Sequence, residues 1–365
     1  MNRLPLHLVV GTLLVLCGGL VSGTPAAYGY WNLVWSDEFD GAMLDTNRWT
    51  FDVDNGYWSD GQWISGWGNN ELEYYTSRTQ NVYVANGVLH LVARKESYGG
   101  SSYTSGRIKS HGLFSKKYGR FEFRAKLPQG QGFWPALWLL PEYPIFPRGQ
   151  YGNWAASGEI DVMENRGSDP TTVQGTIFYG GEWPNQAEST QSDTLPNGGQ
   201  STDFHTYLLE WTTNSMRWYV DGQLYETQTS WWSSGAAYPA PFDQPFYIIM
   251  NLAVGGDYGG NPNVSTVFPG EVQVDYVHVY DYTTNAAAVR ITSIAREGTD
   301  VRVTWMTGSS VTNALQATTG NSSGQYANDF MDIFTITNTV GSVTNYLDSS
   351  ATTNASRFYR VRLAL

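Results

Sequence analysis

The sequence has 365 residues and a formal net charge of −12, with only 15% charged residues but 15 Trp and 24 Tyr. This length fits one large β domain plus a smaller module. The acidic balance without any basic run argues against nucleic acid, whose affinity for proteins comes largely from phosphate neutralisation. Many aromatic side chains with few charges favour a neutral, hydroxyl-rich ligand.

The first 27 residues are predicted to be an export signal. A basic residue, Arg3, precedes an apolar stretch over 6–21, and small residues follow at 21–23 and 25–27. We therefore expect a secreted or extracytoplasmic protein without a membrane span in the mature chain. Cys17, the only cysteine, lies inside this segment, so the mature chain would have no disulfide. A lipoprotein site at Cys17 is the alternative, which Leu16 fits poorly.

Residues 28–283 are predicted to form one all-β domain. Asn86-Gly87 between two apolar runs is the strongest short-hairpin signal. The stretch 119–127 alternates, with Phe121, Phe123 and Ala125 predicted inward and charges outward. A further hairpin is predicted from 204–211 and 216–220, closed by Asp221-Gly222. Because no stretch shows sustained 3.6-residue periodicity, a β-sandwich or barrel is expected.

The stretch 158–165 packs three carboxylates into six residues, alternating with apolar ones. Alternation alone would place Glu159 and Asp161 on an open face and drive Glu164 into the core, where an unpaired carboxylate is costly. A β-bulge near Val162-Met163 would return Glu164 to the open face, and bulges are frequent beside active sites. The pattern then predicts the carboxyl pair of a glycosidase, although an acidic solvated strand has the same pattern.

The chemistry of such a pair depends on its separation. Retaining glycosidases hold the two carboxyls about 5–5.5 Å apart, and inverting ones roughly 6.5–9.5 Å apart. The predicted strand permits the retaining spacing without proving it. Three neighbouring acids cannot all ionise freely, so we expect one raised pKa, as a general acid requires.

Aromatic and histidine residues near this strand have competing interpretations. Trp134 and Trp138 come just before the acidic strand, so at least one is a candidate stacking platform for sugar, although buried aromatics are usually core. His205 could support the site, but a structural histidine is the preferred interpretation.

Residues 289–365 differ in amino-acid composition from the preceding domain. They follow a linker at 283–288 and are rich in Thr, Ser and Asn, with predicted strands at 289–291, 301–305 and 358–363. We expect a small C-terminal β-sandwich module. Carbohydrate binding, spacing and sorting all remain open as its role.

Assembled in order, these stretches resemble glycoside hydrolase family 16, and within it the laminarinase-like β-1,3-glucanases. The resemblance implies a β-jelly-roll sandwich of the concanavalin A-like lectin/glucanase fold, with substrate in the concave groove. The extra Met163 resembles the bulged strand of laminarinase- and galactanase-like members. The matching blocks are Trp35-Ser36-Asp37-Glu38-Phe39, Asn69-Asn70-Glu71-Leu72, Ser105-Gly106-Arg107-Ile108, 118–122, 134–140 and 158–165.

The resemblance also implies residue roles. Glu159 matches the nucleophile, Glu164 the acid/base and Asp161 the residue that orients the nucleophile. No cofactor is implied for catalysis. Positions that would line sugar subsites are Asn69, Glu71, Arg107, Trp134, Trp138 and Trp154.

Two further features concern the same resemblance. A structural calcium is expected from Glu38, the Gly87 carbonyl and Asp275, since hard oxygen ligands suit this ion. Phe178 departs from the family, because laminarinase-like members commonly have a histidine there, and this leaves the linkage preference open.

We therefore expect a monomeric, exported, retaining endo-β-1,3-glucanase acting on laminarin-type polysaccharide. The enzymatic alternative is a family 16 enzyme for mixed-linkage β-glucan or a marine galactan such as agar or carrageenan. The non-enzymatic alternative is a glucan-binding protein without catalysis, although family members of that kind typically lack the two glutamates.

Overall fold

The computed structural model describes residues 29–144, 146–284, 290–306, 311–320, 330–338, 343–349 and 356–363. The chain divides into two compact units, Trp31–Tyr282 and a smaller one comprising Thr283–Leu365 with Met1–Tyr30. The predicted export signal at 1–27, including Cys17, lies outside the described residues. Within the described ranges, no helix has the length and apolar character needed to cross a membrane.

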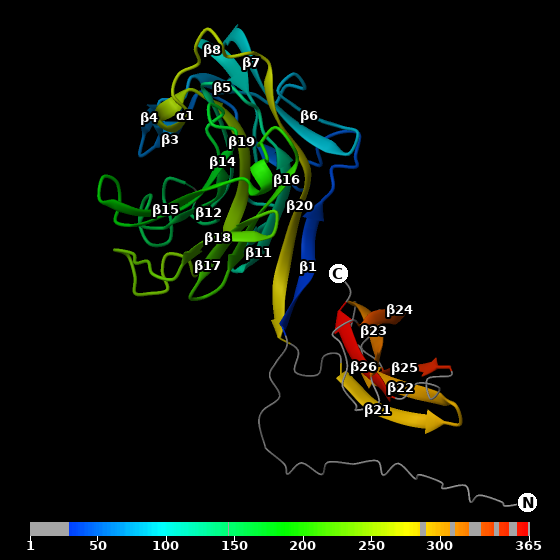
Figure 1. Ribbon diagram of the computed structural model, residues 1–365. Helices are drawn as coiled ribbons and strands as arrows, with labels where there is room; N and C mark the ends of the chain where they lie inside the picture. Colours follow the sequence, from blue (N-terminus) through cyan, green and yellow to red (C-terminus); the bar gives the residue numbers. More distant parts are fainter. Residues whose placement is uncertain are drawn as a thin grey trace, which may run out of the picture. The chain divides into compact units, whose positions relative to one another are not determined.

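The larger unit contains two large sheets, shown in Figure 1. The first has ten strands among the described residues, in the order β18-β17-β16-β11-β20-β7-β8-β5, with β1 beside β20 and β6 beside β7. The neighbours along this order are antiparallel, except β5 with β8, which are parallel. Its strands are β1 (Gly29–Asp37), β5 (Glu73–Tyr75), β6 (Val82–Ala85), β7 (Val88–Tyr98), β8 (Ser101–Ser105), β11 (Gly119–Lys126), β16 (His205–Trp211), β17 (Met216–Val220), β18 (Gln223–Gln228) and β20 (Gly270–Thr284).

The second sheet has eight strands among the described residues, in the order β15-β14-β13-β12-β19-β9-β2, with β10 beside β19. It carries the acidic strand, β13, near its middle. Its strands are β2 (Thr50–Phe51), β9 (Arg107–Lys109), β10 (Ser115–Lys116), β12 (Phe133–Pro141), β13 (Glu159–Glu164), β14 (Thr172–Gly180), β15 (Gln186–Thr194) and β19 (Phe246–Val254).

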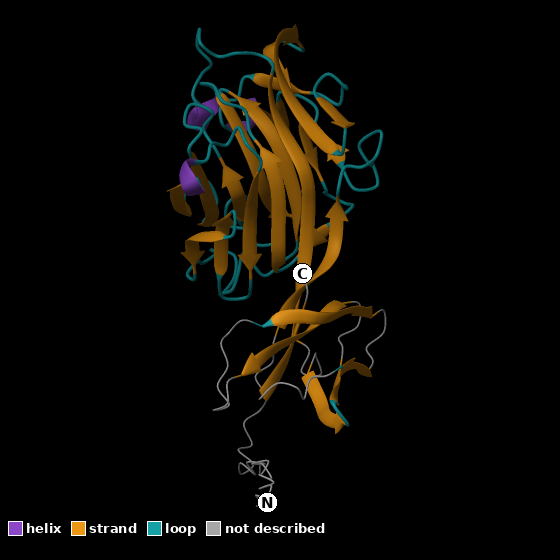
Figure 2. Cartoon of the chain, turned by 45° about the vertical axis from the view of Figure 1, so that its right-hand side comes forward, coloured by secondary structure: helices purple, strands orange, loops and turns teal. Residues whose placement is uncertain are grey.

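Short elements complete this unit. They are the hairpin strands β3 (Gly56–Ser59) and β4 (Gln62–Ser65), the 3-10 turns η1 (Gly66–Gly68) and η2 (Pro196–Gly198), and the one-turn helix α1 (Gly256–Gly259). The predominance of strands is plain in Figure 2.

The core lies between the two large sheets. In β11 the side chains of Phe121, Phe123 and Ala125 are fully buried, as the alternation predicts. In β19 all nine residues are buried, which fits a central strand covered on both faces. The predicted all-β jelly-roll sandwich is confirmed.

The hairpins follow the sequence signals with one exception. Asn86 and Gly87 join β6 to β7, both with positive φ, as a two-residue hairpin turn of type I′ requires. The predicted position of Asp221-Gly222 is wrong: β16 pairs with β17 across the turn 212–215, and Asp221-Gly222 joins β17 to β18. Three consecutive strands, β16, β17 and β18, are joined by two turns, and the Asp221-Gly222 signal was assigned to the first pair instead of the second.

The smaller unit has two three-stranded sheets, β21-β22-β25 and β24-β23-β26, among its described residues. Val303, Trp305 and Leu315 form its core, so it is a small β-sandwich. The strands are β21 (Arg290–Glu297), β22 (Asp300–Met306), β23 (Val311–Gly320), β24 (Met331–Asn338), β25 (Val343–Asp348) and β26 (Ser356–Leu363).

The packing of β11 makes a first testable prediction. Phe123→Ala should destabilise the larger unit by about 3–5 kcal/mol, because it leaves a cavity between the sheets. Leu224→Ala, on the exposed side of β18, should change stability by no more than about 0.5 kcal/mol. Tryptophan fluorescence during denaturant unfolding reports chiefly on this unit, since Trp305 is the only Trp after residue 283. Equal losses in the two variants would contradict the assigned core.

Candidate active site

Strand β13 contains one extra residue relative to its neighbours. On the β12 side, Leu137 faces Met163 but Trp138 faces Asp161, which leaves Val162 unpaired. The register with β14 shifts over the same segment. This confirms the predicted β-bulge. It lets Val162 and Met163 both enter the core while Glu164 returns to the face of Asp161.

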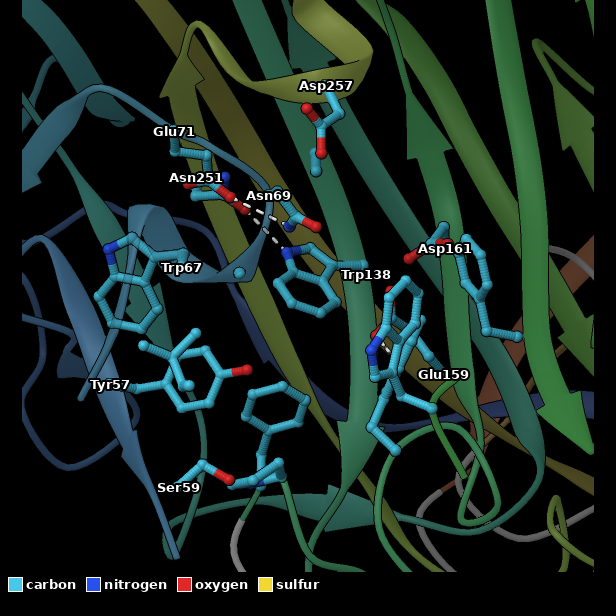
Figure 3. Close-up of a pocket in the computed structure, with 18 of the residues that line it drawn as sticks. Tyr57, Ser59, Trp67, Asn69, Glu71, Trp138, Glu159, Asp161, Asn251 and Asp257 are labelled. Atoms are coloured by element: carbon cyan, nitrogen blue, oxygen red, sulfur yellow. Dashed lines mark hydrogen bonds between the residues drawn. The ribbon is translucent and has the colours of Figure 1, made fainter. Parts of the chain in front are cut away.

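The three acidic residues of β13 face a cleft of about 610 Å³. Figure 3 shows Tyr57 and Trp67 on one side of this cleft, Glu159 and Asp161 on the other, and Trp138 between them. The structure brings every predicted catalytic and subsite residue to the cleft lining: Asn69, Glu71, Arg107, Trp134, Trp138, Trp154, Glu159, Asp161 and Glu164.

The cleft is strongly acidic. Arg107 is its only cationic residue among the described lining residues, and its Nε donates to Asp52 Oδ2 at 2.9 Å. Lys109 also binds this aspartate, at Oδ1. A buried and already paired guanidinium offers little attraction to an anionic ligand, so the cleft favours a neutral one. The acidic lining residues are Glu71, Glu159, Asp161, Glu164, Glu182 and Asp257.

An indole donates a hydrogen bond to each of the two glutamates. Trp154 Nε1 donates to Glu159 Oε2 at 2.7 Å, and Trp134 Nε1 donates to Glu164 Oε1 at 2.9 Å. Because an indole N–H can only donate, it binds the charged carboxylate without competing for its proton. Trp134 and Trp154, both predicted to line sugar subsites, therefore also fix the orientation of the two carboxyl groups.

Burial raises the pKa values of both glutamates. The pKa of Glu159 rises to about 8 and that of Glu164 to about 7, with burial as the largest cause in each case. The Glu164 carboxylate is itself one reason for the raised pKa of Glu159. When Glu164 holds a proton, this repulsion disappears and Glu159 ionises more readily. The pair therefore holds one proton over an intermediate pH range.

Asp161 is the third carboxyl group of the cluster and acts on the ionisation of Glu159. Its side chain is 3% exposed, and burial followed by the charges of Glu159 and Glu164 raises its pKa well above the usual range. Asp161, on the same face of β13, lowers the pKa of Glu159 against the larger raising effect of burial. A protonated Asp161 favours the anion of Glu159, but burial still holds the pKa of Glu159 at about 8, above the value of about 7 for Glu164. The shared proton therefore belongs to the pair.

A chain of hydrogen bonds crosses the floor of the cleft. Trp138 Nε1 donates to Asn251 Oδ1 at 2.7 Å, and Asn251 Nδ2 donates to the Tyr75 hydroxyl at 3.1 Å. The Tyr75 hydroxyl in turn donates to Glu71 Oε2 at 3.1 Å. Since the indole can only donate, every later bond has its direction fixed. Glu71, which also accepts from Asn69, therefore presents acceptor oxygens to the cleft.

Several lining residues were not predicted from the sequence. The Trp67 ring stacks on the Arg107 guanidinium at 4.3 Å, and Arg107 lies 4.9 Å from the Trp138 ring. Trp67 precedes the Asn69-Asn70-Glu71 block by two positions, and this closeness to predicted subsite residues could have identified it as a lining residue. Asn251 was noticeable as the one amide in a buried strand. Tyr57, Glu182 and Trp183 gave no comparable signal.

Phe178 and His205 are two further residues that the sequence analysis singled out. Phe178 lies opposite Glu159 on β14, with its ring centroid 5.4 Å from that of Trp154, so an apolar ring stands beside this glutamate. His205 is buried and bonded to Asp221 Oδ2 and the Gln200 carbonyl, which fits the structural interpretation.

The two carboxylates expected to bind calcium have other partners in the structure. Glu38 Oε1 is bonded to His278 Nε2 at 2.7 Å, and Asp275 is ion-paired with Arg124. Among the described residues, no group of three or more His, Cys, Asp or Glu side chains is placed to hold a metal. Calcium at Glu38, Gly87 and Asp275 stays a prediction of the resemblance.

The hydrogen-bond chain makes a second prediction. Tyr75→Phe should destabilise the larger unit by about 1–3 kcal/mol, because it leaves the buried Asn251 amide and Glu71 each short of a partner. Tyr98→Phe, at a residue with 39% exposure, is the matched control and should have little effect. The midpoint of denaturant unfolding measures both. No difference between the two variants would show that the chain of bonds carries no stability.

Comparisons with known proteins agree with this geometry. The family model for glycosyl hydrolases family 16 matches residues 69–278. The chain is 46% identical over 275 residues to a glucan endo-1,3-beta-glucosidase A1 of Niallia circulans, covering 71% of this chain but 39% of that relative. It is 42% identical over 288 residues to a beta-glucanase of Rhodothermus marinus, covering 74% and 92% of the two chains.

Solved structures give the same result for the larger unit. The laminarinase catalytic domain from Thermotoga maritima has 41% identity and a TM-score of 0.60, covering 69% of this chain and 98% of that one. The laminarinase from Rhodothermus marinus has 41% identity and a TM-score of 0.59, covering 70% and 99%. With a family model that matches more than half of its length, a jelly-roll fold and paired glutamates in one cleft, this chain belongs to glycosyl hydrolases family 16.

Proposed function

We propose that this chain is a retaining endo-β-1,3-glucanase of the laminarinase type. One observation carries the proposal: the bulged strand β13 points Glu159 and Glu164 into one cleft, each held by a tryptophan indole. The relatives support the substrate, because their names include glucan endo-1,3-beta-glucosidase and laminarinase.

In the first step the two glutamates act together on the glycosidic bond. Glu164 donates its proton to the glycosidic oxygen while the Glu159 carboxylate attacks the anomeric carbon. The bond between that carbon and the oxygen breaks, and the distal part of the glucan leaves as an alcohol. The remaining sugar is then an ester of Glu159. The bond from Trp154 keeps this carboxylate oriented before attack.

In the second step Glu164 reverses its role. Its carboxylate takes a proton from water as the water oxygen attacks the anomeric carbon, and Glu159 departs as the anion. Two inversions at the same carbon give overall retention. Only the first step needs a proton on the pair, which the coupled ionisation supplies, and the proton taken from water in the second step restores it to Glu164.

The charge of the cleft supports a neutral substrate. Even with Asp161 protonated and one proton on the glutamate pair, the remaining acidic residues of the lining would repel a sulfated galactan such as carrageenan, and Arg107 is already paired with Asp52. The acceptor oxygens of Glu71 suit sugar hydroxyls, and Trp134, Trp138 and Trp154 offer rings for the apolar faces of sugars. These features also fit a mixed-linkage β-glucan, so a substrate comparison belongs in the first assay.

Export and monomeric action are part of the same proposal. The basic start followed by an apolar stretch at 6–21 supports export, since a polysaccharide substrate lies outside the cell. The cleft is lined by residues of a single chain, so a monomer suffices to form it.

The third prediction tests whether both glutamates are catalytic. Glu159→Gln and Glu164→Gln should each lower kcat on laminarin by several orders of magnitude while leaving the unfolding midpoint nearly unchanged. A reducing-sugar assay on laminarin, barley mixed-linkage glucan, agarose and carrageenan measures this and identifies the substrate.

Azide rescue assigns the roles directly. With an activated β-glycosyl substrate, Glu159→Gly plus azide should give the α-glycosyl azide, because azide takes the nucleophile's place. Glu164→Gly plus azide should give the β-glycosyl azide, because azide attacks the ester on Glu159 from the other face. Exchanged products would reverse the assignment, and wild-type turnover in either Gln variant would overturn the proposal.

The fourth prediction concerns pH. Glu164 must be protonated to act as acid, so kcat/KM should fall as pH rises through its pKa of about 7. Trp134→Phe removes a donor that favours the charged form of Glu164. The pKa of Glu164 should then rise, and the alkaline limb of the kcat/KM profile should move to higher pH.

Two further variants make this prediction specific. Trp154→Phe should raise the pKa of Glu159 in the same way and move the acid limb upward instead. Trp138→Phe is the matched control, because its indole donates to Asn251 and to neither carboxyl, so both limbs should stay in place. A shift of the alkaline limb in Trp154→Phe but not in Trp134→Phe would contradict the assigned roles.

A further inference from the structure

The β3–β4 hairpin has two different faces. Its alternation turns Tyr57, Ser59 and Ile64 towards the cleft, and Figure 3 shows the first two at its side. Trp58 and Trp63 lie at the intervening positions and therefore point away from the cleft. The wall of the cleft thus carries an aromatic outer surface.

This outer surface consists of two neighbouring indoles. Trp58 and Trp63 are direct cross-strand partners, and their ring centroids are 5.5 Å apart at an interplanar angle of 68°. Trp58 is 67% exposed and Trp63 is 37% exposed. Large apolar rings gathered in solvent commonly mark a binding surface, since their exposure is unfavourable without a ligand.

The hairpin holds these rings in a fixed place. Asp60 and Gly61 form its two-residue turn with φ values of 48° and 79°, and both are positive as a type I′ turn requires. The Asp60 carboxylate is ion-paired with Arg148 in the connection between β12 and β13. On the cleft side the Tyr57 ring packs against Phe146, with centroids 5.0 Å apart. The indoles are therefore presented on an anchored support.

We propose that Trp58 and Trp63 form an accessory binding site for β-glucan outside the catalytic cleft. The inference rests on the proposed function, because the expected ligand is a segment of the same polysaccharide. The main argument is continuity with the cleft. The two faces of the β3–β4 hairpin are built from adjacent residues, so a glucan that extends out of the cleft over this hairpin reaches the outer face. Indole rings are neutral and stack on the apolar faces of sugar rings without needing a charged group.

A second copy of the chain fits this surface less well. Stable protein interfaces bury about 800 Å² on each partner. Two indoles, one of them 37% exposed, supply only part of that area, since an aromatic side chain buries about 150–250 Å² at most. A polysaccharide segment needs only a small platform of this kind.

The test measures binding and turnover separately. In the inactive Glu159→Gln chain, adding Trp58→Ala and Trp63→Ala should weaken binding to long laminarin and to insoluble β-1,3-glucan by roughly fivefold or more. Binding of laminaritetraose should not change. In the active chain the same pair should raise KM for long laminarin and leave turnover of laminaritetraose unchanged. Trp58→Tyr with Trp63→Tyr keeps two rings and should restore much of the binding, and Leu224→Ala is the surface control.

The following outcomes of these measurements would each overturn the inference. Unchanged binding of long glucan would show that the indoles do not contact it. Equal losses on laminaritetraose and long laminarin would show that the substitutions disturb the cleft wall. A dimer that becomes a monomer when both tryptophans are replaced would assign the surface to self-association. If the wild-type chain hydrolyses no β-glucan, the proposed function fails first, and the turnover assay reveals this independently of the binding assay.

Discussion

The extra residue in β13 is the constraint on which the site depends. A regular strand would bury Glu164 between the sheets, where an unpaired carboxylate is costly, or would expose Met163 instead. With Val162 inserted, both Val162 and Met163 stay in the core and Glu164 joins Asp161 in the cleft. The bulge therefore reconciles two demands on six residues: a continuous core and three acids on one face.

Placing these acids together in a buried cleft has electrostatic consequences. Mutual repulsion and burial raise their pKa values, and the surrounding donors then decide which group is charged. Each glutamate accepts a hydrogen bond from an indole, but only Glu159 also has its pKa lowered by Asp161. This asymmetry is what makes two chemically identical side chains suited to different roles. It also leaves the cleft acidic and thereby selects neutral ligands.

The sequence predicts the features that depend on short-range pattern. Alternation located β11 and its buried phenylalanines, Asn86-Gly87 located a hairpin, and the conflict at Glu164 located the bulge. Features set by distant partners were missed. Arg107 binds Asp52, 55 positions away, and the Glu38 and Asp275 carboxylates bind His278 and Arg124. No local pattern shows which distant cation a carboxylate will meet.

The β3–β4 hairpin shows why strand alternation matters beyond the core. In a strand packed between sheets, period-two alternation separates core residues from solvent. Here the same alternation separates the cleft side, with Tyr57, from an outer side with Trp58 and Trp63. A hairpin too short to have a core of its own needs external support, which Arg148 and Phe146 provide. Because both sides share one anchored turn, a ligand held on the outer face would remain close to the cleft.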